Sequence, residues 1–247
     1  NKNISLKESF FVMNSTYFCN TFIQFSGLGY RVFYLKKYKN LPISRVINLS
    51  LYTIACEVFV FSFFGLFSLI LVDFFSQNIE ISLIIYLVFL SLFFFSCIYL
   101  FFIEKIFLFL NIEEIFRYEI LKKIINLLIP KLKNKKEFFI KQILVFSIQY
   151  FILLLIFLII LYYLKINDFL YLALLITSLV DFSFLLAFTP YSVGITEFIT
   201  ILGTRDTTLS FAEIIVLINL FRVCMLIIYF VFGPIFIIYK TMRKNGV

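Results

Sequence analysis

The sequence predicts an all-α fold, a polytopic bundle of membrane-spanning helices. Of the 247 residues, 63% are hydrophobic, which is more apolar surface than one soluble core could bury. Four stretches reach the ~20 apolar residues that a helix needs to cross the hydrocarbon layer of a membrane. Basic residues gather between these stretches, as they do in the loops of membrane proteins. Soluble globular classes are therefore excluded.

The N-terminal membrane half, residues 1–103, is predicted to contain a broken helical hairpin followed by two spans. An interrupted apolar stretch covers about residues 9–30, and uninterrupted ones cover about 46–75 and 79–103. The chain begins with Asn1, and its first segment is neither a signal peptide nor an uninterrupted span. We therefore expect further sequence before Asn1.

A basic linker, residues 104–139, is predicted to follow on the cytoplasmic side. Its apolar residues recur at steps of three and four, which favours an amphipathic helix lying in the membrane interface. A lysine cluster near its end either attracts anionic lipid headgroups or only fixes the topology of the chain. The cluster consists of Lys131, Lys133, Lys135 and Lys136.

The C-terminal membrane half, residues 140–247, is predicted to contain spans over about 140–164 and 209–239, separated by an interrupted stretch over about 169–203. Cytoplasmic loops collect Lys and Arg, so the basic loops and the C-terminus belong on the cytoplasmic side of the cell (inner) membrane. The interrupted stretch must then start and end outside, as a re-entrant hairpin. The hairpin at 9–30 would enter from the cytoplasm, so the two halves would form an inverted repeat.

The first interruption is a glycine kink followed by a positive charge. Gly27 and Gly29 precede Arg31 within an otherwise apolar segment. Glycine lets the backbone leave the helical ladder, and the arginine fork can hold a phosphate through two hydrogen bonds. We therefore expect this turn to face a phosphate group.

The second interruption is a proline and glycine kink followed by a negative charge. Pro190, Ser192 and Gly194 precede Glu197. Proline removes a backbone donor, and the half-helix that begins after the kink exposes amides whose partial positive charge suits a phosphate or carboxylate. Glu197 either offsets that charge or binds a cationic group.

Three further charges lie deep inside apolar segments, namely Glu57, Asp181 and Arg222. Ionisable groups are costly in hydrocarbon and usually find a partner there. We expect Glu57 to pair with Arg222, for a structural or a functional reason. Asp181 faces either the second kink or a partner such as Arg222, or is a hydrogen-bonded packing residue.

These residues make up the candidate substrate-binding site of a phospholipid or polyprenyl-phosphate headgroup. The site comprises Gly27, Gly29, Arg31, Glu57, Asp181, Pro190, Ser192, Gly194, Glu197 and Arg222.

Metal and cofactor chemistry finds no support in the sequence. The chain has no His, which is the commonest metal ligand and general base. Its four Cys stand singly in apolar stretches, without the spacing of a zinc site or a disulfide framework. We expect no metal, no cofactor and no catalytic residue.

Two segments resemble a known family. The stretch from Leu186 to Gly233, with the second kink, Glu197 and then Arg222, resembles the C-terminal signature of the lysylphosphatidylglycerol synthase transmembrane region, the flippase-like domain family. The stretch from Phe25 to Phe67, with the first kink and Glu57, resembles its N-terminal part. The resemblance implies an integral membrane domain with re-entrant helices that acts as a lipid flippase, or is linked to lipid-carried glycans.

The leading hypothesis is a lipid translocase whose partners are membrane lipids rather than nucleic acid. The first alternative is a membrane-embedded glycosyl- or phospho-transferase acting on a lipid carrier, for which no paired-acid motif is present. The second is a non-transporting scaffold for a separate synthase or glycosyltransferase, which could also be a partner of a translocase. The lipid, the energy source and the oligomeric state stay open.

Overall fold

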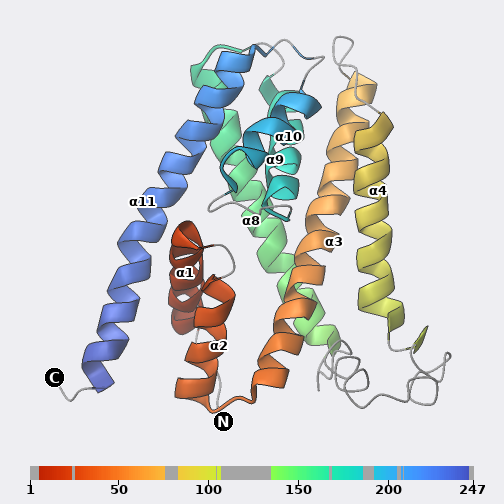
Figure 1. The fold of residues 1–247 in the computed structure, drawn as a ribbon. Coiled ribbons are helices and arrows are strands. Elements are labelled where there is room, and N and C mark those ends of the chain that lie inside the picture. The colour runs from red at the N-terminus through yellow and green to blue at the C-terminus, as the bar shows by residue number, and fades with distance from the viewer. Residues whose placement is uncertain are drawn as a thin grey trace. The chain divides into compact units, whose positions relative to one another are not determined.

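The computed structural model of the chain describes residues 6–23, 26–75, 83–103, 105–106, 135–166, 169–185, 192–204, 207 and 209–244, and every regular element among them is a helix. The all-α prediction is therefore confirmed (Figure 1). Its helices are α1 (Leu6–Phe22), α2 (Ser26–Lys39), α3 (Ile43–Phe75), α4 (Leu83–Cys97), the π-helical turn η1 (Ile98–Phe102), α8 (Lys135–Tyr163), α9 (Phe169–Leu185), α10 (Ile195–Gly203) and α11 (Phe211–Lys244).

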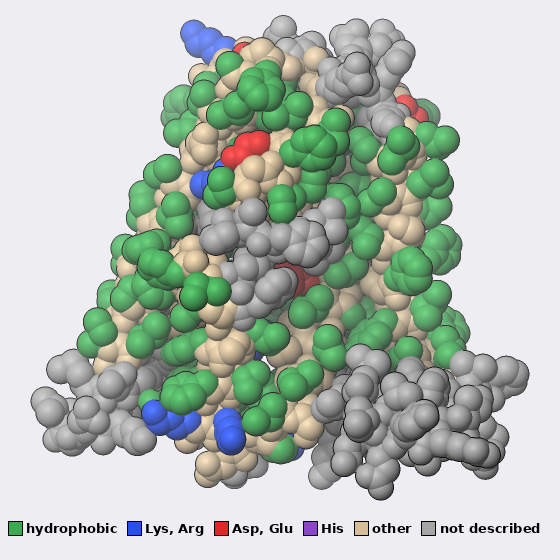
Figure 2. All heavy atoms as spheres, in the orientation of Figure 1, with side chains coloured by type: hydrophobic (Ala, Val, Ile, Leu, Met, Phe, Trp, Pro, Cys, Tyr) green, Lys and Arg blue, Asp and Glu red, His purple; other side chains and the backbone are tan. Residues whose placement is uncertain are grey.

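Within the described part of the chain, four helices are long and apolar enough to cross a membrane, namely α3, α4 with its continuation η1, α8 and α11. They correspond to the four spans predicted from the sequence, and the chain is a multi-pass membrane protein. Hydrophobic side chains cover the visible surfaces of α4 and α11 in Figure 2. The hydrocarbon layer surrounds such surfaces in place of water.

Two helices that flank the second interruption are shorter. The 17 residues of α9 extend about 25 Å at 1.5 Å per residue, and the nine residues of α10 extend about half as far. Neither reaches the ~30 Å of a bilayer core on its own. The predicted linker helix and the cluster residues Lys131 and Lys133 lie outside the described residues.

The chain divides into two compact units. The first unit contains residues 1–41, 183–202 and 209–247, and the second contains 42–182 and 203–208. Each unit therefore combines segments that are far apart in the sequence.

In the first unit, α1 packs along the second part of α11. Ser15 Oγ donates a hydrogen bond of 3.2 Å to the carbonyl oxygen of Gly233. The rings of Tyr17 and Tyr229 stack with centroids 5.1 Å apart. A Cβ atom at Gly233 would lie 2.5 Å from the Cβ atom of Phe18, so glycine is what permits this close approach.

The glycine kink predicted at Gly27 and Gly29 is not present, because both residues lie within the continuous helix α2. The chain reverses direction before Ser26 instead. Ser26 Oγ donates to the carbonyl oxygen of Cys19 at 2.7 Å, and the Gly27 amide donates to Asn20 Oδ1 at 2.7 Å. Gly27 is buried against α1, where it allows the two helices to meet.

The second unit is held together by an apolar core and a chain of hydroxyl groups. Tyr52, Cys56, Val60, Leu100 and Phe146 form the core cluster, which joins α3, η1 and α8. Within the same unit, the Tyr150 hydroxyl lies 3.0 Å from both Ser68 Oγ and Ser178 Oγ. These contacts link α8 to α3 and α9.

Candidate functional site

The second interruption is a backbone turn between α9 and α10. Ser192 has φ of 56° and Gly194 has φ of 85°, both in the left-handed region that glycine adopts without steric cost. The helix α10 starts directly afterwards, and the Phe198 amide donates 3.0 Å to the carbonyl oxygen of Gly194. Pro190 lies outside the described residues.

Glu197 folds back onto the start of its own helix. The Gly194 amide donates a hydrogen bond of 2.9 Å to Glu197 Oε2. An acid three residues into a helix that accepts from the N-cap amide forms the acidic half of a capping box. The negative charge also lies at the positive end of the helix dipole, where it is stabilised.

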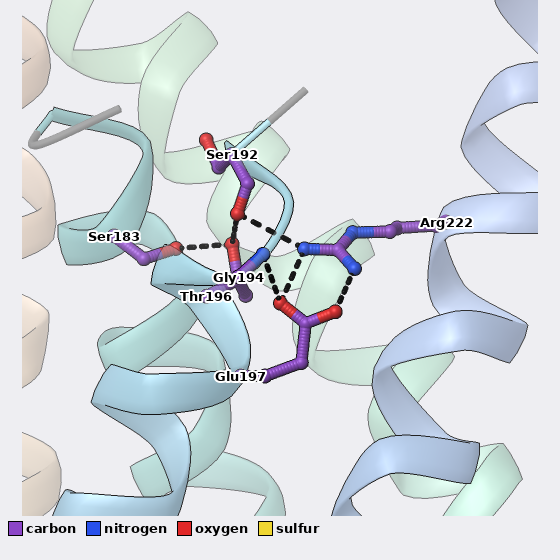
Figure 3. Close-up of polar contacts among 6 residues, drawn as sticks. All are labelled: Ser183, Ser192, Gly194, Thr196, Glu197 and Arg222. Carbon is purple, nitrogen blue, oxygen red and sulfur yellow. Dashed lines mark hydrogen bonds and ion pairs between the residues drawn. The ribbon is translucent and has the colours of Figure 1, made fainter. Parts of the chain in front are cut away.

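Arg222 reaches this carboxylate from α11. Its Nη1 donates to Glu197 Oε1 and its Nη2 donates to Glu197 Oε2 at 2.8 Å, so the pair is bidentate (Figure 3). The same Nη2 also donates to the carbonyl oxygen of Ser192 at 3.0 Å. The side chains of Arg222 and Glu197 are only 8% and 18% exposed. The guanidinium group thus joins α11 to both sides of the turn.

Two hydroxyl groups complete the arrangement. Ser183 Oγ, near the end of α9, donates 2.9 Å to Thr196 Oγ1, which in turn donates 3.1 Å to the carbonyl oxygen of Ser192. That oxygen therefore accepts from Thr196 and from Arg222. The Ser192 hydroxyl itself is buried and has no hydrogen-bond partner among the described residues. The turn is thus fixed by polar contacts to α9, α10 and α11.

The family model of the lysylphosphatidylglycerol synthase TM region matches residues 1–233 of the chain. The chain belongs to this family. Searches of curated proteins and of solved structures found no match to this chain. The family match covers both predicted kinks, α3, α4 and α8 in full, α11 as far as Gly233, and the Glu197–Arg222 pair.

The ion pair of this family member differs from the one expected. The sequence analysis assigned Arg222 to Glu57, whereas the structure pairs it with Glu197. The reason is local, because the turn before α10 brings Glu197 beside the guanidinium group and both of its outer nitrogens are used there. Glu57 lies half-buried on α3, in the second unit.

Asp181 belongs to the same second unit and lies half-buried on α9. Its carboxyl group lies close enough to that of Glu57 for the two to interact electrostatically. Asp181 also lies within electrostatic reach of the Tyr150 hydroxyl. The sequence analysis did not consider Glu57 as a partner of Asp181.

The remaining predicted site residues lie on α2. Arg31 is half-buried and forms no ion pair with any residue that the structure describes. Gly29 is exposed, and a Cβ atom there would meet nothing within 4 Å. Gly27 packs against α1, so its role in the structure is packing.

The contacts between α1 and α11 show that the C-terminal end of α1 points toward Arg222. Along α1, Ser15 contacts Gly233 whereas Phe18 and Phe22 contact Phe230. The two helices therefore run antiparallel, and the turn after α1 points back along α11. Arg222 lies eight residues before Phe230, about 12 Å along the helix axis.

Sequence reasoning named four of the residues at the turn, Ser192, Gly194, Glu197 and Arg222. It missed Thr196 and Ser183 as site residues. A threonine four residues after a kink is a usable signal, because its hydroxyl can bond the carbonyl four residues back. Among the described residues, no group of three or more His, Cys, Asp or Glu side chains could hold a metal ion.

Proposed function

We propose that this member of the lysylphosphatidylglycerol synthase TM region family is a lipid translocase of the cell membrane. It would move a phosphate-bearing headgroup, of a phospholipid or of a polyprenyl-linked carrier, from one leaflet to the other. The observation that carries the proposal is the Glu197–Arg222 pair at the first turn of α10. A guanidinium group beside a helix N-terminus favours an anion such as phosphate.

The proposal includes two re-entrant hairpins. The lengths of α9 and α10 support a hairpin that enters and leaves from one face, because neither helix alone would cross the hydrocarbon layer. The 17 residues of α1 and the 14 of α2 would form the other hairpin, from the cytoplasmic face. Together they would be the corresponding parts of an inverted repeat, with the basic loops in the cytoplasm.

The antiparallel course of α1 and α11 supports a common depth for the two turns. The turn after α1 points along α11 toward Arg222, and the turn before α10 contacts Arg222 directly. In this account both turns lie near the middle of the membrane. Non-helical backbone at that depth requires protein or water around it, which fits a headgroup cavity.

The chemistry of transfer follows from the exchange of partners at Arg222. In the resting state Glu197 occupies both outer nitrogens of the guanidinium group and the Gly194 amide. A phosphate would take over these donors, since it offers the same paired oxygens with more charge. The released Glu197 would then accept from an amine or hydroxyl of the headgroup. Arg31 would supply a second cation to the phosphate.

A flipping assay in proteoliposomes tests the proposal. The wild-type protein should expose a fluorescent anionic phospholipid of the inner leaflet to a membrane-impermeant quencher. Glu197→Gln and Arg222→Gln should each lower the rate at least about tenfold, which corresponds to about 1.4 kcal/mol in the barrier. Glu137→Gln, which breaks an exposed pair with Lys141, serves as the control and should flip like wild type. Equal flipping by all four proteins would contradict the proposal.

A further inference from the structure

The second unit contains a groove that is separate from the Glu197–Arg222 site. It lies between α3 and the end of α4 and has a volume of about 250 Å³. Its lining includes Leu51, Ala55 and Val58 from α3, and Phe95, Ser96 and Tyr99 from α4 and η1. Both helices are among the four membrane-spanning ones, so the groove opens toward hydrocarbon.

The groove arises from small residues and from a change in helix type. Ala55 and Ser96 leave space where two larger side chains would meet. The turn η1 directly follows, and a π-helical turn is wider than an α-helical one and is frequent at functional sites. Ser96 Oγ donates 2.8 Å to the carbonyl oxygen of Phe93, so its proton is used within its own helix. The face left toward the groove is apolar.

Among the residues that the structure describes, exposed cations gather at one end of the second unit, close to the groove. The core cluster brings Tyr52, Leu100 and Phe146 together, so the start of α3, the end of η1 and the start of α8 lie at the same end of the unit. Exposed cations at this end are Arg45, Lys105 and Lys136, and Lys135 Nζ lies 5.9 Å from the ring centroid of Tyr52. The acid of α8 at this end, Glu137, is already paired with Lys141 at 2.5 Å.

We propose that the groove binds one acyl chain of an anionic phospholipid whose headgroup lies among these basic side chains. Hydrocarbon is the medium at this depth, and apolar lining gives water no hydrogen-bond partners. A groove of about 250 Å³ has room for roughly eight groups of the size of a water molecule, at ~30 Å³ each. It can therefore hold part of one lipid chain. Positive charge near a membrane surface attracts anionic lipids. This site goes beyond the proposed translocation site, because it holds a lipid by its tail.

Photolabelling of the whole protein in nanodiscs tests the inference. Two probes carry the same photoactivatable acyl chain, one on phosphatidylglycerol and one on phosphatidylcholine. The phosphatidylglycerol probe should label peptides containing residues 51–58 and 95–99 several-fold more than other lipid-facing helical segments, and several-fold more than the phosphatidylcholine probe does. Even labelling along all spans, or equal labelling by the two probes, would overturn the inference. A crosslink between two protein chains through these residues would do so as well.

Variants separate the groove from the surrounding surface. Ser96→Leu fills the groove and should reduce labelling by phosphatidylglycerol several-fold. Ser91→Leu is the matched control, because Ser91 is exposed on the same helix and bonds the Val88 carbonyl in the same way, so labelling should not change. Lys135→Gln with Lys136→Gln should remove the preference for phosphatidylglycerol. Lys36→Gln with Lys37→Gln, on α2, removes equal charge and should leave the preference intact.

Discussion

Arg222 is held in place by several acceptors that come from a single turn of the chain. Glu197 neutralises the charge of Arg222. Nη2 of Arg222 donates one hydrogen bond to Glu197 and another to the carbonyl oxygen of Ser192. A charge without a counter-ion is costly within the membrane. Removing one partner of a buried ion pair therefore lowers the stability of the protein by more than the intact pair adds to it. The pair is therefore best tested by removing one partner and then both.

Glu197→Ala should destabilise the protein by about 3 kcal/mol, because it leaves the guanidinium group of Arg222 without its counter-ion. The double variant Glu197→Ala with Arg222→Ala should recover most of that loss. Thermal unfolding in detergent micelles measures both effects. Glu137→Ala is the control, and its loss should stay below about 1 kcal/mol because both members of that pair are exposed. A double variant less stable than either single variant would argue against direct pairing.

Two glycines of α2 differ sharply in what surrounds them. Gly27→Ala should lower stability by about 1–3 kcal/mol, since its Cβ atom would collide with the carbonyl oxygen of Thr16 and with Asn20 Oδ1. Gly29→Ala should have no such cost and should gain up to about 1 kcal/mol from helix propensity. Melting temperatures of the two variants, side by side, check this. If both lose stability equally, α1 and α2 do not pack as described.

At this scale the sequence indicated the charged residues but not their partners. Glu197 and Arg222 stand out because ionisable residues are rare in apolar segments. Arg222 pairs with Glu197 rather than with Glu57 because of the left-handed turn at Ser192 and Gly194. The spacing of residues in the sequence does not predict this turn. The electrostatic interaction between Asp181 and Glu57 likewise depends on how α3 and α9 pack.

At the scale of helices, hydroxyl groups rather than charges connect α3, α8 and α9. Tyr150 has one proton and lies between Ser68 and Ser178, which also bond the carbonyl oxygens of Phe64 and Leu174. Hydrogen bonds between membrane helices each contribute a modest amount, on average ~0.6 kcal/mol. Tyr150 lies 3.0 Å from both serines, its single proton can serve one of them at a time, and its ring also stacks on Phe64.

Tyr150→Phe should therefore cost about 1 kcal/mol, because the ring and its stacking are kept while both hydroxyl contacts are lost. Tyr163→Phe is the control, since Tyr163 is 79% exposed at the end of the same helix. Thermal unfolding of the two variants in one detergent gives the comparison. An unchanged melting temperature for Tyr150→Phe would show that the hydroxyl chain does not stabilise the unit.

The four spanning helices were predictable because uninterrupted apolar length is a direct consequence of membrane thickness. The break before α10 was predictable too, from Pro190 and Gly194. The break before α2 was placed at the wrong residues, because a glycine in an apolar segment can permit either a kink or the close packing of two helices. Gly27 serves close packing between helices rather than a change of backbone direction.

In the first unit, α11 is the element that contacts both α1 and the turn before α10. Its middle binds the turn before α10 through Arg222, and its second half packs against α1 through Tyr229 and Gly233. Such an arrangement depends on contacts between distant parts of the chain, so hydropathy alone could not reveal it. The proposed headgroup site depends on this arrangement, because both turns would then lie along α11.

The most direct test of the central claim is water and lipid access to the turn before α10. In a background with Cys19, Cys56, Cys97 and Cys224 replaced by alanine, Val193→Cys should react with a membrane-impermeant thiol reagent, since Val193 is 55% exposed beside Gly194. Short-chain phosphatidylglycerol should slow the reaction, whereas phosphatidylcholine of equal chain length should not. Phe198 is also exposed, on α10, and the proposed function places it toward lipid, so Phe198→Cys should stay unreactive. If Val193→Cys is as inert as Phe198→Cys, or if anionic lipid gives no protection, the turn is not a headgroup site.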